Sequence, residues 1–203
     1  MNFYEERILP HLVHLSMRSR ELLPYRKRIA SAAEGRVLEI GIGSGLNLPY
    51  YGPRAGEIIG LEPASRLVRM SGDAAGKSGM RVSLLEASAE EIPLEAHSID
   101  TVLTTWTMCT IPRPERALEE MRRVIKPGGQ FLFVEHGLAP DHRVRNWQHR
   151  LTPLWERVAG GCHLDRPIKA LIESSGFKLD CIDMGYARGP KLLTYFYEGR
   201  ARP

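Results

Sequence analysis

The chain has 203 residues, 43% of them hydrophobic and 26% charged, which is typical of a single compact domain, here 1–203. No apolar run approaches the ~20 residues that cross a bilayer, and no signal peptide opens the chain, so we expect a cytoplasmic protein with at most a peripheral membrane contact. The net charge of +4 suits acidic partners, but the basic residues are dispersed and form no recognisable RNA module, which disfavours a nucleic-acid partner.

The cysteines are odd in number and far apart in the chain, at Cys109, Cys162 and Cys181. This spacing matches neither a disulfide framework nor a metal-binding motif, and the seven histidines are equally scattered. We therefore predict no metal. We expect Cys109 to lie in the core and Cys162 to pack or to line a pocket.

The first 33 residues combine an apolar stripe with a basic run. The stripe recurs at near-helical spacing, at Tyr4, Ile8, Leu12 and Leu15. Pro10 suits the first turn of a helix better than its middle, so the segment predicts two helical pieces. It could form a lid over a ligand site, could rest on a membrane surface, or could be a packed helix with a solvated basic face.

A short apolar strand beginning at 37 ends in three closely spaced glycines, Gly41, Gly43 and Gly45. Without side chains there, a ligand can approach bare backbone, and we expect a following helix whose first N–H groups are unpaired. A dinucleotide-binding turn places its third glycine three residues after the second, a position held here by Leu46. The turn therefore indicates a nucleotide-like ligand, and its spacing argues against a nicotinamide dinucleotide.

A second apolar strand, 57–61, ends at Glu62. A carboxylate at this position can accept hydrogen bonds from both ribose hydroxyls, a feature that NAD-binding proteins share. The alternative is a solvated glutamate at a strand end.

The alternation of strands and helices then continues. Residues 84–93 indicate a strand entering a loop, and 98–105 a strand introduced by a turn. An amphipathic helix over 116–125 stops at the K-P-G-G run 126–129 and leads into a strand at 130–136.

Two strands close the chain, at 177–184 and 192–197. Because a parallel crossover needs about a dozen residues or more, so short a join requires an antiparallel pair. We therefore predict an α/β fold: a Rossmann-like, doubly wound, mostly parallel seven-stranded sheet closed by a C-terminal antiparallel hairpin. Such a hairpin resembles the methyltransferase arrangement, whereas dinucleotide-binding sheets usually stay parallel.

Taken in order, the motifs resemble those of class I S-adenosylmethionine-dependent methyltransferases: E-x-G-x-G-x-G at 39–45, an acid after the second strand, A-S-A-E-x-I-P at 87–93 and S-I-D-x-V at 98–102. The resemblance implies S-adenosylmethionine as cofactor. It implies cofactor contacts from Glu39, Gly41, Gly43, Gly45, Asn47, Glu62, Pro63, Ser88, Ala89, Glu90, Thr104 and Thr105. Many relatives carry aspartate at Ser88, whose hydroxyl can still accept from adenine, but without charge.

A narrower resemblance covers most of 36–197. The runs TMCTIP (107–112), VEHGLA (134–139) and above all GGCHLDR (160–166) look like the small methyltransferase-like thiol methyltransferases. A likeness to bacterial phosphatidylethanolamine N-methyltransferases rests on 37–51 alone.

The segment 137–169 stands where this fold commonly inserts a substrate cover. Trp147 and Trp155, with leucines between them, could form an apolar wall. Imidazole groups in general can exchange protons near neutral pH, so His136 and His163 are each either a structural residue or a weak catalytic base. His136 is the stronger candidate because it follows a strand end at the ligand-facing edge.

Methyl transfer from a sulfonium mainly requires an acceptor held in line, and a thiol acceptor must also lose its proton. Arg166 could favour the thiolate, while Trp106, after the fourth strand, could form the floor of the methyl site or simply pack. We expect a small, fairly apolar acceptor, a thiol ahead of a phospholipid amine. A cofactor-binding subunit without catalysis, and a membrane or RNA adaptor, remain as alternatives, and the sequence indicates no oligomeric state.

Overall fold

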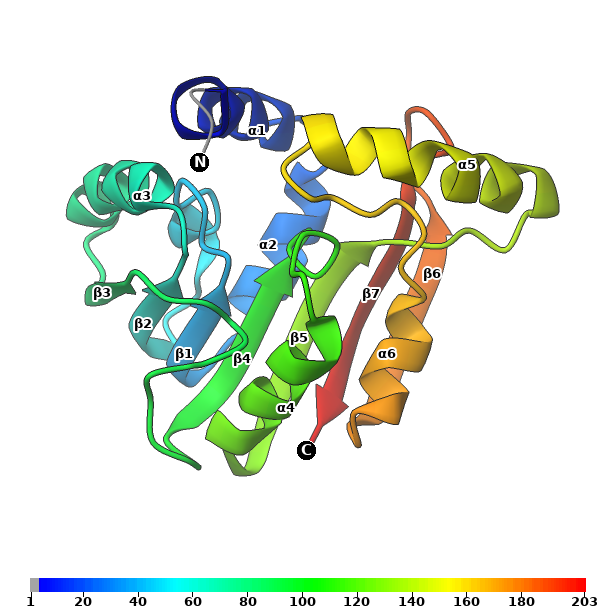
Figure 1. Ribbon diagram of the computed structural model, residues 1–203. Helices are drawn as coiled ribbons and strands as arrows, with labels where there is room; N and C mark the ends of the chain where they lie inside the picture. Colours follow the sequence, from blue (N-terminus) through cyan, green and yellow to red (C-terminus); the bar gives the residue numbers. More distant parts are fainter. Residues whose placement is uncertain (1–3) are drawn as a thin grey trace.

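A seven-stranded sheet in the order β3-β2-β1-β4-β5-β7-β6 organises the protein, for which a computed structural model describes residues 4–203 (Figure 1). The strands are β1 (Gly35–Ile40), β2 (Ala55–Leu61), β3 (Val82–Leu85), β4 (Ile99–Thr105), β5 (Ile125–His136), β6 (Lys178–Tyr186) and β7 (Tyr195–Arg202). The pairs among β1 to β5 are parallel, and β7 runs antiparallel to both β5 and β6. This confirms the predicted α/β sheet with its C-terminal antiparallel hairpin.

The helices are α1 (Leu9–Met17), α2 (Leu23–Ser31), α3 (Ser65–Ser78), α4 (Pro114–Val124), α5 (His142–Val158) and α6 (Ile168–Ser174). Short π-helical and 3-10 turns occur at Tyr4–Ile8 and Leu48–Tyr50. Pro10 stands in the first turn of α1, as its fixed φ favours, and the N-terminal segment does form two helices. Within the described residues, no helix has the length and apolar character needed to cross a bilayer.

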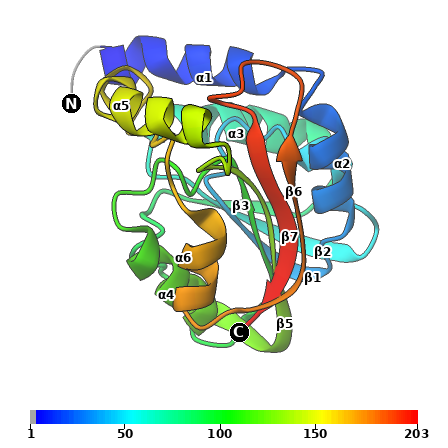
Figure 2. The ribbon, with the colours of Figure 1, turned by 90° about the vertical axis from the view of Figure 1, so that its right-hand side faces the viewer.

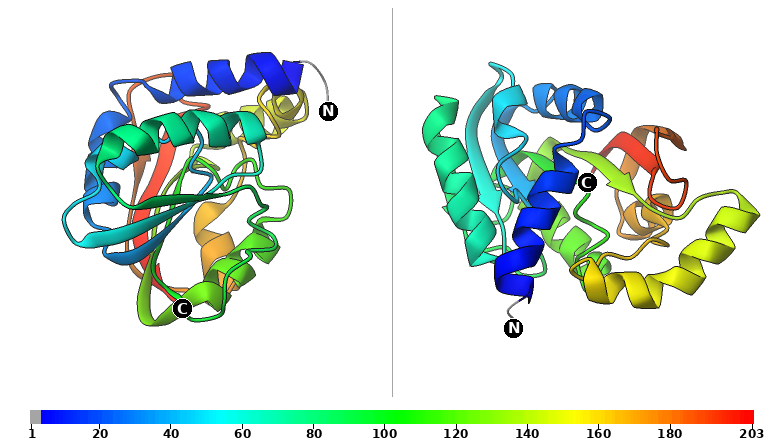
Figure 3. Two further views of the ribbon diagram at one scale, coloured as in Figure 1. Left: turned by 90° about the vertical axis from the view of Figure 1, so that its left-hand side faces the viewer. Right: turned by 90° about the horizontal axis from the view of Figure 1, so that it is seen from above.

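The sheet has a hydrophobic core on each face, because successive strand residues point to opposite sides. On β1, Leu38 and Ile40 pack with α4 and α6, whereas Val37 packs with the residues of α2 and α3. Figure 2 shows these two helical layers on either side of the sheet. Helices α1 and α5 belong to neither layer and lie over the carboxyl ends of the strands (Figures 1 and 3).

Three local predictions need correction. The glycine turn is followed by the 3-10 turn Leu48–Tyr50 rather than by an α-helix, because Pro49 and the Gly52-Pro53 pair leave no room for one. Helix α4 ends at Val124, and Ile125 already pairs with Ile99 of β4.

The last strand begins three residues later than predicted and continues to Arg202. Its second half alternates polar and small residues, with Arg200 and Arg202 exposed and Ala201 buried. The run of apolar residues that predicts this strand therefore ends at Tyr197, although the strand itself continues to Arg202.

Candidate active site

The three glycines form a tight turn directly after β1, at the carboxyl edge of the sheet. Gly41 has a φ of +65°, a conformation that L side chains rarely adopt. A Cβ on Gly41 would also lie 2.4 Å from Cγ2 of Thr107, in the loop after β4. The turn therefore runs close against that loop, and glycine is the residue that fits there.

Glu62 follows β2, and its carboxylate reaches back to the glycine turn. Its Oε2 accepts from the backbone N–H of Gly43 at 3.1 Å, and its Oε1 accepts from that of Ala64 at 3.1 Å. Burial raises the pKa of Glu62, and the two hydrogen bonds oppose that effect. Each oxygen keeps further acceptor capacity, so the fixed carboxylate can still bind a vicinal diol.

Two cavities open at this edge of the sheet, and Gly41, Glu62 and Pro63 line both. The larger, about 330 Å³, also borders α1 and the residues after β4, while the smaller, about 110 Å³, borders Ser88 and Ala89. A ligand with its ribose at Glu62 would extend an adenine one way and an amino-acid chain the other. The residues present therefore fit S-adenosylmethionine.

Asn47 is the centre of a buried polar network below the turn. Its Nδ2 donates to Oε1 of Glu39 at 2.7 Å and to Oγ1 of Thr105 at 3.0 Å, and its Oδ1 accepts from Arg26 at 2.7 Å. The Tyr51 hydroxyl donates to the other Glu39 oxygen at 2.7 Å. Burial raises the pKa of Glu39 to about 7 against these hydrogen bonds.

Neither Glu39 nor Asn47 lines either cavity, whereas Thr105 lines the larger one. The structure thus gives the first two a supporting position under the turn. Their direct contact with the cofactor stays a prediction.

Trp106, directly after β4, lines the larger cavity as part of an aromatic cluster. Its φ of +51° is rare for a bulky residue, and such strained backbone is concentrated at functional sites. The ring contacts Phe196 edge-on, with centroids 5.7 Å apart, and Tyr25 at 6.5 Å. The guanidinium of Arg26 lies 4.9 Å from the indole centroid, within cation–π range.

Helix α1 forms the outer wall of the larger cavity. Its residues Leu9, Val13 and His14 line the space, and Nδ1 of His14 lies 2.6 Å from Oγ of Ser44 in the glycine turn. The end of α5 meets it there, because a Cβ on Gly160 would lie 2.8 Å from Leu9 (Figure 3). Helix α1 therefore borders the cavity, and the role of segment 1–33 as a lid stays a prediction.

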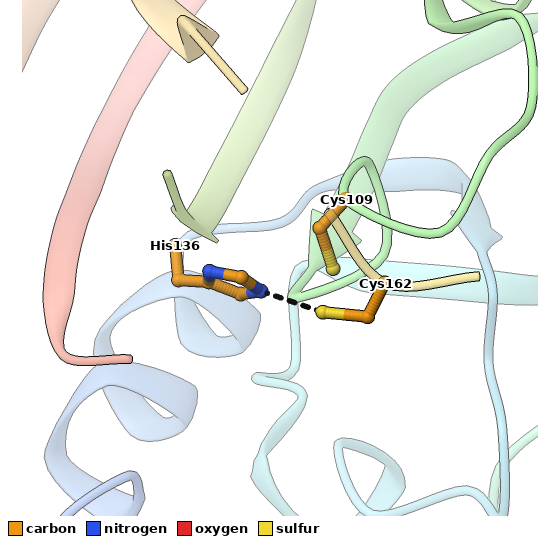
Figure 4. A group of neighbouring side chains, drawn as sticks. All are labelled: Cys109, His136 and Cys162. Atoms are coloured by element: carbon orange, nitrogen blue, oxygen red, sulfur yellow. Dashed lines mark hydrogen bonds between the residues drawn. The ribbon is translucent and has the colours of Figure 1, made fainter. Parts of the chain in front are cut away.

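Two cysteines and a histidine converge beside this cavity (Figure 4). Cys109 follows β4, His136 ends β5 and Cys162 follows α5, with Nε2 of His136 3.2 Å from Sγ of Cys162. The Cys109 thiol and then His136 lower the pKa of Cys162. Burial works against protonation of His136, but the contact with Cys162 raises its pKa, and burial raises the pKa of the adjacent Glu135 to about 7.

The other two predicted catalytic side chains lie around this cluster. Nε2 of His163 is 3.4 Å from a carboxylate oxygen of Glu156 on α5, and Nη2 of Arg166 donates to the carbonyl of Ile111 at 2.8 Å. Neither residue lines the two cavities, in contrast to Trp106. As described, His163 and Arg166 hold the loops that surround the site.

The remaining predicted cofactor residues, Gly45, Glu90 and Thr104, line neither cavity. Glu90 is paired with Arg113 at 2.6 Å, and the buried Oγ1 of Thr104 has no hydrogen-bond partner in the described chain. A Cβ on Gly45 would lie 2.9 Å from that of Ala74, so this glycine lets α3 approach the turn. Their direct contact with cofactor stays a prediction.

A larger hollow, about 630 Å³, lies at the opposite edge of the sheet. Its charged residues are largely paired, for example Lys126 with Asp100 at 2.7 Å and Arg54 with Glu34 at 2.8 Å. Ligands of open α/β sheets bind at the carboxyl ends of the strands, so we place the site with Glu62 instead.

Comparison with known proteins agrees with this geometry. A family model described as a methyltransferase domain matches residues 38–133, which run from β1 through most of β5. A solved structure of the Bacillus subtilis protein YcgJ covers 81% of this chain and 72% of its own, with a TM-score of 0.66 and 22% identity, and so shares the fold. The chain is a class I S-adenosylmethionine-dependent methyltransferase, and its cofactor is S-adenosylmethionine.

Within that class the chain resembles the thiol S-methyltransferases. Thiol S-methyltransferase TMT1B of Rattus norvegicus is 29% identical over 168 residues, which are 80% of this chain and 68% of the relative. Phosphatidylethanolamine N-methyltransferase of Cereibacter sphaeroides is 32% identical over 116 residues, but these are only 55% of this chain and 57% of that protein. The predicted class is confirmed, and the acceptor is left to proposal.

Sequence reasoning missed the contributions of α1 and α2. Tyr25, Arg26 and His14 follow no recognised motif. In the structure His14 reaches Ser44 in the glycine turn, Arg26 reaches Asn47 just after it, and Tyr25 contacts Trp106. Cys109 is buried as predicted and Cys162 is half-buried. The contact of Cys162 with His136 was not foreseen, although the runs that resemble thiol methyltransferases contain all three residues of the cluster.

Proposed function

We propose that the protein transfers the methyl group of S-adenosylmethionine to the thiol of a small, fairly apolar molecule. The observation that carries this proposal is the charge of the larger cavity. Among the described side chains that line it, Glu62 is the one acid, and its position is that of the ribose acceptor. An ammonium group would find no second carboxylate there, whereas an apolar thiol needs none.

The cofactor supplies an electrophilic methyl group on its sulfonium, and the chain supplies position. Glu62 would hold the ribose, Ser88 and the backbone of Ala89 would border the adenine, and Arg26 at the other end would suit a carboxylate. Trp106 presents an aromatic surface beside the reacting space, which favours both an apolar acceptor and a cationic sulfonium.

The acceptor thiol must reach the site as a thiolate, because the thiolate is the nucleophile. A free thiol with a pKa of about 8.5 is partly ionised at neutral pH, so its proton can leave to solvent without a strong base. The ring of His136 faces Cys162 rather than the cavity, which argues against a direct contact of its Nε2 with an acceptor. The rate should therefore rise with pH toward the pKa of the acceptor.

A phospholipid amine is the second candidate, and exposed apolar side chains favour it. On α1, Leu12 is 49% and Leu15 69% exposed, and on α5, Trp147 is 54% and Leu154 62% exposed. The two helices lie together over the site (Figures 1 and 3). On this reading the protein is cytoplasmic and docks peripherally on a membrane, with 1–33 as lid and 137–169 as substrate cover.

An acceptor panel tests both candidates. Purified protein is incubated with methyl-labelled cofactor and, separately, with small aliphatic and aromatic thiols, small amines, phenols, and vesicles containing phosphatidylethanolamine. We expect label in the thiols without vesicles, at a rate that rises with pH. Label in the vesicles alone, weakened by salt as surface attraction is screened, would replace the thiol proposal by the lipid one.

A further inference from the structure

The cluster of Cys109, His136 and Cys162 is more than a packing contact, because three metal-ligating atoms face one another. The two sulfur atoms and one ring nitrogen all lie within 4.8 Å of one another, and the Nε2–Sγ distance from His136 to Cys162 is 3.2 Å. Figure 4 shows the three side chains pointing to a common centre, His136 from the end of β5 and the two cysteines from the segments after β4 and α5. None of the three side chains lines either of the two cavities at this edge of the sheet.

The donor set has the composition of a zinc site. Zinc is bound by thiolate sulfur at about 2.3 Å and by imidazole nitrogen at about 2.0–2.1 Å, usually in tetrahedral geometry. Those bond lengths require the ligand atoms to be about 3.5–3.8 Å apart. The separations here, from 3.2 Å to at most 4.8 Å, reach that geometry with small side-chain rotations.

The surroundings of the cluster agree with such a centre. His136 is buried, and its Nδ1 has no hydrogen-bond partner within residues 4–203, so Nε2 is the nitrogen directed at the sulfurs. Cys109 is 2% exposed, while Cys162 keeps partial access to solvent. Cys109 is thus fully enclosed, and the partial exposure of Cys162 leaves a path for an ion to enter.

We propose that Cys109, His136 and Cys162 form a binding site for a thiophilic divalent cation of the zinc type. This replaces the expectation of no metal, which rested on spacing along the chain: residues 109, 136 and 162 have no motif spacing, yet they meet at the ends of β4, β5 and α5. Three protein ligands leave one tetrahedral position for a small molecule, as in zinc sites that act on a ligand.

The site adjoins the methyl-transfer cavity. The carbonyl of Trp106, which lines that cavity, accepts from Sγ of Cys109 at 3.7 Å, and Gly160, another lining residue, stands two positions before Cys162. If the acceptor is a thiol, as proposed above, its sulfur is a suitable fourth ligand. It would bind as the thiolate after losing its proton to solvent, which is the form that accepts a methyl group.

The direct test is metal binding by the full chain. Wild-type protein is kept reduced with a phosphine, freed of metal, and titrated with zinc and with cobalt(II), whose thiolate charge-transfer absorption reports sulfur ligation. We expect one ion per chain. C109S and C162S should each weaken zinc affinity by at least about 100-fold and reduce the cobalt–thiolate band, which the C109S/C162S double variant should lose.

C181S is the matched control, because Cys181 is an exposed cysteine on β6 remote from the cluster. It should bind zinc as the wild type does. Far-ultraviolet circular dichroism checks that each variant is folded, and H136Q, which keeps both cysteines, should weaken zinc binding even if one serine variant unfolds. Fully reduced wild-type protein, with all three thiols free, that binds no zinc, or a C109S/C162S double variant that binds it normally, overturns the site.

Addition of a small thiol to the cobalt-loaded protein tests the link to the acceptor. A changed charge-transfer band supports thiol binding at the fourth position. An unchanged band in an active thiol methyltransferase would refute that link while leaving the metal site in place. The metal titrations need no acceptor, so they stand even if the thiol proposal fails.

Discussion

The carboxylate of Glu62 provides the sharpest test of where the cofactor binds. In Glu62→Gln one of its two oxygens becomes an NH2 group. Both oxygens now accept backbone N–H groups, from Gly43 and from Ala64, each at 3.1 Å. In either orientation of the amide, its NH2 group therefore faces a backbone N–H group, so two hydrogen-bond donors oppose each other. The substitution also removes one acceptor for the ribose.

The expected loss of affinity follows from the energy of hydrogen bonds to charged groups, about 1.5–3 kcal/mol each. One lost bond to the ribose corresponds to about a 10- to 150-fold rise in Kd, at about 1.4 kcal/mol per factor of ten. Calorimetry with the demethylated product, S-adenosylhomocysteine, measures this directly. Thermal unfolding of the ligand-free variant measures separately the cost to the glycine turn.

Glu86→Gln is the matched control. Glu86 is a second acid on the same edge of the sheet, directly after β3, but it is exposed, bonds to Ser65 and lines neither cavity. The variant should leave the affinity for S-adenosylhomocysteine within about twofold of wild type. If E62Q binds as tightly as E86Q, Glu62 does not hold the ribose and the site has been placed wrongly.

Three further experiments address the turn, the buried acid and the lid. Gly41→Ala adds both backbone strain and a contact between the new Cβ and Thr107 at 2.4 Å, whereas Gly43→Ala adds only backbone strain. Melting curves should therefore show G41A as the less stable variant, by about 1–3 kcal/mol relative to wild type. Equal melting temperatures for the two variants would contradict the close approach of Gly41 to Thr107. Burial raises the pKa of Glu39 from 4.5 to about 7, so wild type should lose stability relative to E39Q as pH rises from about 4.5 to 7. Denaturant titrations at pH 5 and 8 should show a loss of about 3 kcal/mol. If the stability difference between wild type and E39Q is the same at both pH values, the acid is not held neutral. S-adenosylhomocysteine should slow tryptic cleavage within 18–28 if the N-terminal segment closes on the cofactor, and equal rates with and without it would leave α1 a fixed wall.

The parts of the site that could be predicted from sequence depend on short-range physics. The left-handed φ at position 41 requires glycine, and the acid at 62 directly follows an apolar strand. Both features can therefore be predicted from a few neighbouring residues. The antiparallel closing pair was visible because its connection is short. Strand alternation on β1 likewise predicts its two buried faces.

The parts that could not be predicted depend on contacts between distant residues. Arg26 comes from α2 and reaches Asn47 only because that helix packs across β4 and β5. Cys109 and Cys162 are separated along the chain by two helices, α4 and α5, and one strand, β5, and cysteine spacing alone does not show that the fold brings them together. Pro49 was overlooked as the residue that prevents a helix after the glycine turn.

The order of the strands explains why these distant pieces meet in one place. From β1 the chain proceeds outward to β2 and β3, and it then returns to the other side of β1 as β4 and continues to β5. The connections after β1 and β4 therefore leave in opposite directions, and a crevice forms where adjacent strands part. Gly41 borders that crevice from β1 and Trp106 from β4.

The same topology separates the two halves of the reaction. The predicted cofactor residues, the glycines and Glu62, lie on the β1–β2 side, where they would hold groups common to every use of the cofactor. Cys109, His136 and Cys162 lie on the β4–β5 side, beneath α5, where the acceptor must arrive. Specificity for the acceptor can therefore change with the β4–β5 loops and α5 while the cofactor half is untouched.

For that reason we expect substitutions at Cys162 to alter metal and acceptor binding but to leave the affinity for S-adenosylhomocysteine within about threefold of wild type. This range is smaller than the effect of losing one hydrogen bond. A C162S variant that loses S-adenosylhomocysteine as severely as E62Q would show that the two halves are one site.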